Sequence, residues 1–166
     1  MKKNTIVVSD VDGCLTDGGF YYTSEGKIMK RFGAGDHEGV KLLKKNDIDV
    51  VFITADKVGL PIVAKRMKDM SNSNLKVYNE VERRKFVESL RDDYDTIVFF
   101  GDGIGDLKIA ENGLCDIFVC PKQSRKEVKD VADYVTEYDG GQGAYLDMAI
   151  WVAKKLKKDL YKDLYD

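Results

Sequence analysis

The chain has 166 residues, of which 43% are hydrophobic and 34% charged, and its formal net charge is −2 at pH 7. This balance is typical of a soluble globular protein, and the length suits a single domain spanning residues 1–166. Without a net positive charge we expect no binding to nucleic acid or to an anionic membrane, and no apolar run is long enough to span a bilayer. The N-terminal segment MKKNTIVVSD lacks the pattern of a signal peptide. Three cysteines without CxxC spacing, Cys14, Cys115 and Cys120, favour reduced thiols in a cytoplasmic protein.

Five short runs rich in β-branched and aromatic residues predict strands. Several of them are continuously apolar, which is typical of strands covered on both faces. The predicted strands span residues 5–10, 49–55, 75–79, 96–102 and 115–120.

Helical patterns lie between these strands. Asp36 is placed to cap a helix over 37–46, and Pro61 falls in the first turn of a helix within 58–70. Asn79 and Glu82 have the spacing of a capping box, which predicts the start of a helix that ends near residue 90. A fourth, short helix is predicted over 105–112. Strands alternating with helices predict an α/β fold, a three-layer α/β/α sandwich with a central parallel sheet.

Two segments depart from this alternation. Residues 19–32 read as a β-hairpin with an aromatic first arm, a SEG turn and a returning arm. Residues 139–164 read as a glycine-rich turn followed by a long helix. One stripe of that helix is apolar and consists of Leu146, Ile150, Ala153, Leu156, Leu160 and Leu164.

Polar side chains cluster where predicted strands end. Asp10 and Asp12 end or follow the first strand, and Thr54 ends the second. Asp102 and Asp106 follow the fourth strand within the segment GDGIGD. Ligands of open α/β sheets bind outside the carboxyl ends of the strands, so we expect these groups to converge although they are far apart in sequence.

Crowded carboxylates need a positive charge between them. Several carboxylate oxygens suit a hard cation, and Mg²⁺ typically takes one or two carboxylates with waters and substrate phosphate. A second positive charge is expected from a lysine in the helical region before the fourth strand, where Lys85 is the best placed. Carboxylate nucleophile, carboxylate acid/base, hydroxyl, lysine and magnesium together indicate phosphoryl transfer through an aspartyl-phosphate.

Four segments in order resemble the motifs of the haloacid dehalogenase-like phosphatases, which have a Rossmann-like fold. DVDGCLTDG is similar to their first motif, VFITA to the second, Lys85 to the third and GDGIGD to the fourth. The longer segments DVDGCLTDGGFYYTSEGKIMKRF and DHEGVKLLKKNDIDVVFIT, with ADYVT followed by GGQGA, resemble a branch without a cap domain. That branch contains the 3-deoxy-D-manno-octulosonate 8-phosphate phosphatases and the nonulosonate (N-acylneuraminate/KDN-type) 9-phosphate phosphatases.

The resemblance implies roles for the carboxylates. Asp10 matches the nucleophile that becomes phosphorylated and also binds Mg²⁺. Asp12 matches the general acid/base, and its backbone carbonyl is expected to bind the metal. Asp102 matches the second metal carboxylate, and Asp106 matches the residue that orients Lys85 or a metal-bound water.

The remaining implied roles concern the substrate. Thr54 is expected to hydrogen-bond a phosphoryl oxygen, and Lys85 to bridge the nucleophile and the phosphate. The second motif of octulosonate phosphatases commonly continues Thr-Gly-Arg, whereas here Ala55 and Asp56 follow Thr54. These two residues are therefore expected near the sugar. His37, the only histidine, is either a substrate contact or an ordinary residue at a helix start.

The C-terminal segment also departs from the family. The common pattern has an arginine before the acid that follows GG-x-GA, whereas this chain has Tyr145, Leu146 and Asp147. Both departures concern positions expected to face the substrate. They leave open whether the sugar is 3-deoxy-octulosonate 8-phosphate, a nonulosonate 9-phosphate or another keto-sugar acid phosphate, and so whether the pathway is lipopolysaccharide or sialic acid biosynthesis.

The resemblance further implies a homotetramer in which the hairpin joins neighbouring subunits. The aromatic hairpin residues Phe20, Tyr21 and Tyr22 could instead pack within one chain. Two alternatives to a phosphatase remain. One is a non-catalytic oligomerisation module related to the phosphatase domain of acylneuraminate cytidylyltransferases. The other is a receiver-like phospho-switch, which would carry its phosphoacceptor on the third strand rather than on the first.

Overall fold

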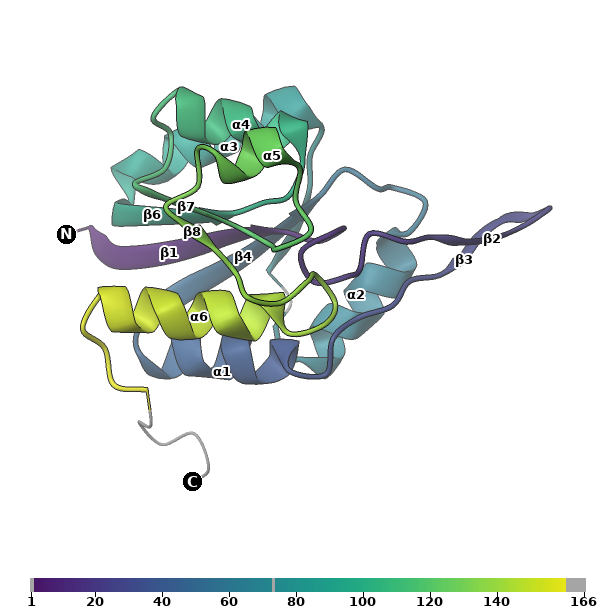
Figure 1. Cartoon of the computed structure of the whole chain (residues 1–166), viewed down its shortest axis with the longest axis horizontal. Helices are drawn as coiled ribbons and strands as arrows, with labels where there is room; N and C mark the ends of the chain where they lie inside the picture. Colours follow the sequence, from purple (N-terminus) through teal and green to yellow (C-terminus); the bar gives the residue numbers. More distant parts are fainter. Residues whose placement is uncertain (1, 73, 161–166) are drawn as a thin grey trace.

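The computed structural model describes residues 2–72 and 74–160. Its centre is a six-stranded sheet in the order β5-β4-β1-β6-β7-β8, with every neighbouring pair parallel (Figure 1). The three central strands β4, β1 and β6 are almost wholly buried because helices cover both faces of the sheet. The strands are β1 (Lys3–Asp10), β4 (Ile48–Thr54), β5 (Leu75–Val77), β6 (Tyr94–Phe100), β7 (Ile117–Cys120) and β8 (Tyr134–Val135).

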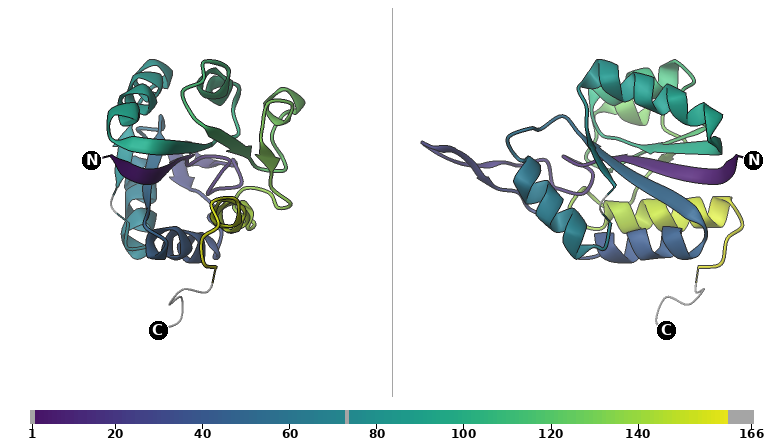
Figure 2. Two further views of the ribbon diagram at one scale, coloured as in Figure 1. Left: turned by 90° about the vertical axis from the view of Figure 1, so that its left-hand side faces the viewer. Right: turned by 180° about the vertical axis from the view of Figure 1, so that it is seen from behind.

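Two helical layers enclose the sheet (Figures 1 and 2). On one face α1 (Asp36–Lys45) packs against α6 (Ala144–Lys155), with α2 (Leu60–Asp69) beside them. The other face carries α3 (Glu80–Ser89), the 3₁₀ turn η1 (Leu90–Asp92), α4 (Ile104–Glu111) and α5 (Lys126–Lys129). Each layer encloses its own buried apolar cluster, one centred on Phe52 and Tyr145 and the other on Phe99 and Phe118.

The segment between β1 and α1 forms a separate two-stranded hairpin. Strands β2 (Tyr21–Thr23) and β3 (Gly26–Met29) pair antiparallel and project away from the sandwich (Figures 1 and 2). Its aromatic and aliphatic side chains are exposed: Phe20 by 45%, Tyr21 by 47%, Tyr22 by 65%, Ile28 by 48% and Met29 by 53%. Among the described residues, no helix is long and apolar enough to cross a membrane.

The predicted fold class is confirmed, as are several local details. Asn79 accepts from the backbone N–H groups of Val81 and Glu82, and Glu82 accepts from the N–H of Asn79, which completes the capping box. Pro61 lies in the first turn of α2. Asp36, however, is not a cap: Gly35 precedes the helix, and Asp36 is a buried first-turn residue that accepts from the N–H of Gly33 at 3.2 Å.

The prediction of a helix to residue 164 is wrong at its end. Helix α6 stops at Lys155, and Lys157 adopts a left-handed conformation with φ of 55°. The N–H groups of Lys157 and Lys158 donate to the carbonyls of Lys154 and Ala153, which is a Schellman turn formed without glycine. Residue 164 lies outside the described residues. Two short elements at the sheet edge, α5 and β8, were not predicted because each is shorter than the patterns that signal a helix or strand.

Candidate active site

The strand register brings the predicted site residues to one edge of the sheet. Asp10, the last residue of β1, lies opposite Ile53 of β4, so Thr54 follows on the neighbouring strand. On its other side, β1 pairs with β6 through Ser9 and Phe100, after which the chain continues to Asp102. The predicted convergence at the carboxyl ends of these strands is therefore what parallel pairing produces.

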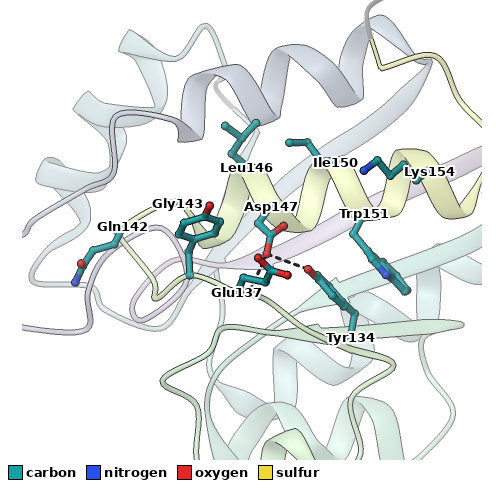
Figure 3. Close-up of a pocket in the computed structure, with 10 residues that line it drawn as sticks. Tyr134, Glu137, Gln142, Gly143, Leu146, Asp147, Ile150, Trp151 and Lys154 are labelled. Atoms are coloured by element: carbon teal, nitrogen blue, oxygen red, sulfur yellow. Dashed lines mark hydrogen bonds between the residues drawn. The ribbon is translucent and has the colours of Figure 1, made fainter.

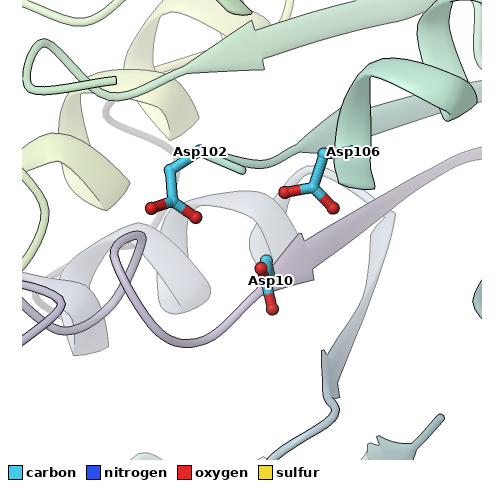
Figure 4. A group of neighbouring side chains, drawn as sticks. All are labelled: Asp10, Asp102 and Asp106. Atoms are coloured by element: carbon cyan, nitrogen blue, oxygen red, sulfur yellow. The ribbon is translucent and has the colours of Figure 1, made fainter. Parts of the chain in front are cut away.

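Three carboxylates meet at this edge. Asp10, Asp102 and Asp106 each place an oxygen so that the three atoms lie within 4.8 Å of one another (Figure 4). Asp106 is buried in the first turn of α4 and accepts a hydrogen bond from the N–H of Gly103 at 3.0 Å. Asp10 accepts from the N–H of Val11 at 2.9 Å, which fixes the nucleophile candidate at the end of its strand.

The electrostatics of this cluster reflect burial and mutual repulsion. Burial, followed by the charges of Asp106 and Asp102, raises the pKa of Asp10 well above its ordinary value. Burial and then the charge of Asp106 raise the pKa of Asp102 to about 7. Burial also raises the pKa of Asp106, against the opposing effect of Arg83. The protein alone thus leaves these carboxylates short of positive charge.

Arg83 is the cation that the chain itself supplies. Its Nη1 lies 2.5 Å from Asp106 Oδ1, and its Nη2 lies 3.3 Å from Asp10 Oδ1. The side chain is only 8% exposed, and the two carboxylates raise the pKa of Arg83 although burial opposes them. A guanidinium has a fork of donors suited to holding two carboxylates at once.

This geometry corrects the expectation for Lys85. Lys85 is exposed on α3 and does not reach the carboxylates, whereas Arg83 does. Two helical residues two positions apart point about 200° apart, so only one of them can face the sheet. Arg83 shares its face with the buried residues Val87 and Leu90, at i+4 and i+7. That spacing is visible in the sequence and could have identified Arg83.

Glycines allow the loops to close around the cluster. Gly13 has φ of +81°, and a Cβ added there would lie 2.0 Å from Asp102 Oδ2. A Cβ added at Gly140, in the glycine-rich turn before α6, would lie 2.0 Å from the carbonyl oxygen of Gly13. Gln123, which sequence reasoning missed, joins the same two loops: it donates to the carbonyl of Gly13 at 2.6 Å and accepts from the N–H of Gly140 at 2.9 Å.

Asp12 and Thr54 lie beside the carboxylate cluster in different surroundings. The carboxylate of Asp12 is 23% exposed and pairs with Lys30, whose Nζ lies 2.6 Å from Asp12 Oδ1. The Thr54 side chain is buried, and its hydroxyl oxygen accepts from the N–H of Asp56 at 3.1 Å. That bond leaves the Thr54 hydroxyl hydrogen available to donate.

Asp56 has partners within the protein rather than an open position. Its carboxylate pairs with Lys27 and with Lys30 Nζ at 2.7 Å, and it accepts from the N–H of Gly59. Burial raises the pKa of Asp56, but the two lysines have the opposite and stronger effect. The pKa of Asp56 therefore lies below its ordinary range. Ala55, the other predicted substrate neighbour, is exposed. Lys27 and Lys30 were not identified from the sequence.

The C-terminal residues that depart from the family pattern lie away from the carboxylates of their own chain. Tyr145 is fully buried between Phe52 and Phe100. Leu146 and Asp147 line a hollow of about 550 Å³, where Asp147 accepts from the hydroxyl of Tyr134 at 3.1 Å (Figure 3).

The only histidine lies outside the carboxylate cluster as well. His37 is exposed on α1 and borders a different hollow, together with Lys41, Lys44 and Met70.

The donor set fits a magnesium ion. Three acidic side chains offer hard oxygen ligands within a small space, and Arg83 pairs with only two of them. Within residues 2–72 and 74–160, no salt bridge reaches Asp102. A divalent cation beside Asp102 and Asp10 would supply positive charge that counteracts the effects of burial and mutual repulsion on their pKa values.

Comparisons with known proteins agree with this reading. No protein-family model matches the chain. The chain is 27% identical over 152 residues to the 3-deoxy-D-manno-octulosonate 8-phosphate phosphatase of Haemophilus influenzae, a match covering 90% of this chain and 82% of that protein. It is also 25% identical to N-acylneuraminate cytidylyltransferase B of Danio rerio, a match covering 89% of this chain but only 36% of that protein.

Solved structures are similar over nearly the whole chain. The cobalt-bound octulosonate phosphatase of H. influenzae matches with a TM-score of 0.80 and 26% identity, covering 92% of this chain and 88% of that one. The phosphatase of Moraxella catarrhalis, in complex with magnesium, phosphate and KDO, matches with a TM-score of 0.80 and 26% identity, covering 92% and 87%. The homologues and structural neighbours of this chain are thus mainly 3-deoxy-D-manno-octulosonate 8-phosphate phosphatases of the haloacid dehalogenase superfamily, the family that its four motifs resemble, and an N-acylneuraminate cytidylyltransferase is also among them.

Proposed function

We propose that this protein is a Mg²⁺-dependent phosphomonoester hydrolase that acts through an aspartyl-phosphate on 3-deoxy-D-manno-octulosonate 8-phosphate or a related keto-sugar acid phosphate. The observation that carries the proposal is the convergence of Asp10, Asp102 and Asp106 around Arg83 at the carboxyl edge of the sheet. The relatives named for this activity match the chain over most of its length.

In the first step, an oxygen of Asp10 attacks phosphorus while the bond from phosphorus to the sugar oxygen breaks. Asp12, protonated at this stage, donates its proton to the leaving sugar oxygen. Thr54 donates its hydroxyl hydrogen to a phosphoryl oxygen, and Arg83 holds Asp10 in place while facing the transferring group. Ala55 would border the sugar; Asp56 would act there mainly through the lysines that it holds.

In the second step, water attacks the phosphorus of the aspartyl-phosphate. Asp12, now a carboxylate, accepts the proton of that water, and Asp10 is released with inorganic phosphate. Mg²⁺, held by Asp10, Asp102 and the backbone carbonyl of Asp12, would stabilise negative charge on the phosphoryl oxygens. Asp106 keeps Arg83 aligned through their close ion pair.

The hairpin suggests how the site is completed. Its residues Tyr21, Tyr22 and Met29 are apolar and exposed, which suits contacts with a second copy of this chain, and we propose a homotetramer joined through the hairpin. Without a cap domain, the edge of the site stays accessible to water. Assembly would shield that edge. The free thiols of Cys14, Cys115 and Cys120 are compatible with a cytoplasmic location.

One rival function has a specific observation in its favour. The match to an N-acylneuraminate cytidylyltransferase favours a non-catalytic assembly module. Such a module has no need of a buried arginine between two carboxylates, which this chain retains.

The test of the proposed function is phosphate release from octulosonate 8-phosphate and nonulosonate 9-phosphates in the presence of Mg²⁺. We expect turnover of at least one of them, and its loss in D10N. Equal and very poor turnover of both classes would place the substrate elsewhere. Phosphate release that survives unchanged in D10N would refute Asp10 as the nucleophile.

A further inference from the structure

A four-member ion cluster links the hairpin to the acid/base candidate. It consists of Lys27, Lys30, Asp56 and Asp12. Lys30 follows β3 of the hairpin, and its side chain is fully buried. A buried ammonium is costly unless it is paired, and Lys30 meets both Asp12 and Asp56 within 2.7 Å.

The surroundings hold Lys30 in this position. Its Nζ lies 5.3 Å from the ring centroid of Phe20, and Lys27 Nζ lies 3.8 Å from the same ring. Across the cluster, a Cβ added at Gly59 would lie 2.3 Å from Asp56 Oδ2 and 2.6 Å from the Cε of Lys30. The loop after β4 thus leaves room for the lysine only because residue 59 has no side chain.

The pairing is selective for one oxygen of Asp12. Lys30 contacts Oδ1, and in the part of the chain that the structure describes no hydrogen bond reaches Oδ2. One oxygen is therefore fixed by the lysine while the other is left for a proton transfer. Asp56 serves Lys30 as an anchor, because its Oδ2 binds both Lys30 and Lys27 while its Oδ1 accepts from the N–H of Gly59.

We infer that Lys30 is a positioning residue, held by Asp56, that aims the carboxyl group of Asp12 at the leaving oxygen of the substrate. The inference rests on the proposed function, since it assigns Lys30 an effect on one step of that reaction. Asp56 stands where octulosonate phosphatases commonly have an arginine. The inference gives Asp56 a different role, which is to anchor Lys30.

The test uses the dependence of catalysis on the leaving group. An alkyl or sugar phosphate needs its leaving oxygen protonated, whereas the phenolate of p-nitrophenyl phosphate leaves without a proton. General acid catalysis typically contributes about 10²–10⁴-fold. In K30M we therefore expect kcat/KM to fall by about 10²-fold for the sugar phosphate and by less than about threefold for p-nitrophenyl phosphate.

D12N should show the same substrate dependence, and K30M should add little in the D12N background, because Lys30 acts through Asp12. D56N, which removes the acceptor Oδ2 but can keep the bond to Gly59, should give a smaller loss of the same kind. K65Q, at the exposed Lys65–Asp69 pair, is the matched control and should leave both substrates unaffected.

Equal losses for both substrates in K30M would overturn the inference, because a general structural disturbance does not distinguish leaving groups. Should K30M fold poorly by thermal denaturation, the K30M/D56N pair removes one charge of each sign and carries the same expectation. A wild-type protein that hydrolyses neither substrate would refute the proposed function itself. An active wild type with equal losses in the variants refutes only the role of Lys30.

Discussion

Replacement of Asp102 by asparagine removes one of the three crowded carboxylates while keeping nearly the same shape. Asp102 has no salt-bridge partner among the described residues, and burial together with Asp106 raises its pKa to about 7. In metal-free protein at neutral pH, the ionised Asp102 therefore opposes folding. We expect D102N to be more stable than the wild type under these conditions.

The magnitude follows from the two pKa values. In the unfolded chain the carboxyl group loses its proton near its ordinary value of 3.8, whereas in the folded protein it keeps the proton until about 7. The unfolded state then binds fewer protons, so wild-type stability falls as pH rises through this window. At about 1.4 kcal/mol per pH unit, the full interval corresponds to an upper value of about 4 kcal/mol. About 3 kcal/mol of it falls between pH 5 and pH 8.

The assay is urea unfolding of both proteins in EDTA at pH 5, 6, 7 and 8. The difference between wild type and D102N cancels the titrating groups that do not interact with Asp102, and we expect the advantage of D102N to grow with pH. Adding Mg²⁺ at pH 8 should stabilise the wild type much more than D102N and narrow the difference, because ligand at about 100 times its Kd stabilises a folded protein by about 2.7 kcal/mol. A difference that does not change with pH, or an equal response of both proteins to Mg²⁺, would refute the electrostatic reasoning.

Three further outcomes follow from the site and the hairpin. R83M should lower kcat/KM for phosphate release by about 10²–10³-fold, whereas K85A should stay within about twofold of wild type; the reverse pattern would restore Lys85 to the site. G13A should lose the Mg²⁺-induced rise in Tm, because its Cβ would meet Asp102 and its φ is positive; an unchanged rise would contradict the close approach. Y22E should shift the protein toward monomer in light scattering, and an unaltered mass would remove this part of the hairpin from the interface.

Much of the fold is readable from the sequence because it depends on patterns longer than a few residues. The buried strands are apolar runs, and alternation with helices leaves a parallel sheet as the simple solution. A parallel sheet in turn brings Asp10, Thr54 and Asp102 to one edge, so the convergence is predictable without knowing any contact. The capping box at Asn79 is a purely local signal, and it is confirmed.

What escaped prediction depends on orientation and on contacts between distant segments. Choosing Lys85 over Arg83 ignored the helical face defined by Val87 and Leu90. The pairing of Lys30 with Asp12 and Asp56 joins the hairpin to two strand ends, and no local pattern marks it. The early end of α6 depends on a lysine in a left-handed conformation, which propensity argues against.

The central claim is that phosphate is transferred through Asp10. It is tested most directly in D12N, in which the base for the second step is missing and the phosphorylated protein should accumulate. After brief reaction with Mg²⁺ and p-nitrophenyl phosphate, whose leaving group needs no proton from residue 12, and an acid quench, peptide mass spectrometry should find one phosphoryl group on Asp10, removable by hydroxylamine. Phosphoryl on a different residue, or phosphate release in the wild type with no acyl-phosphate on Asp10 in D12N, would contradict the account.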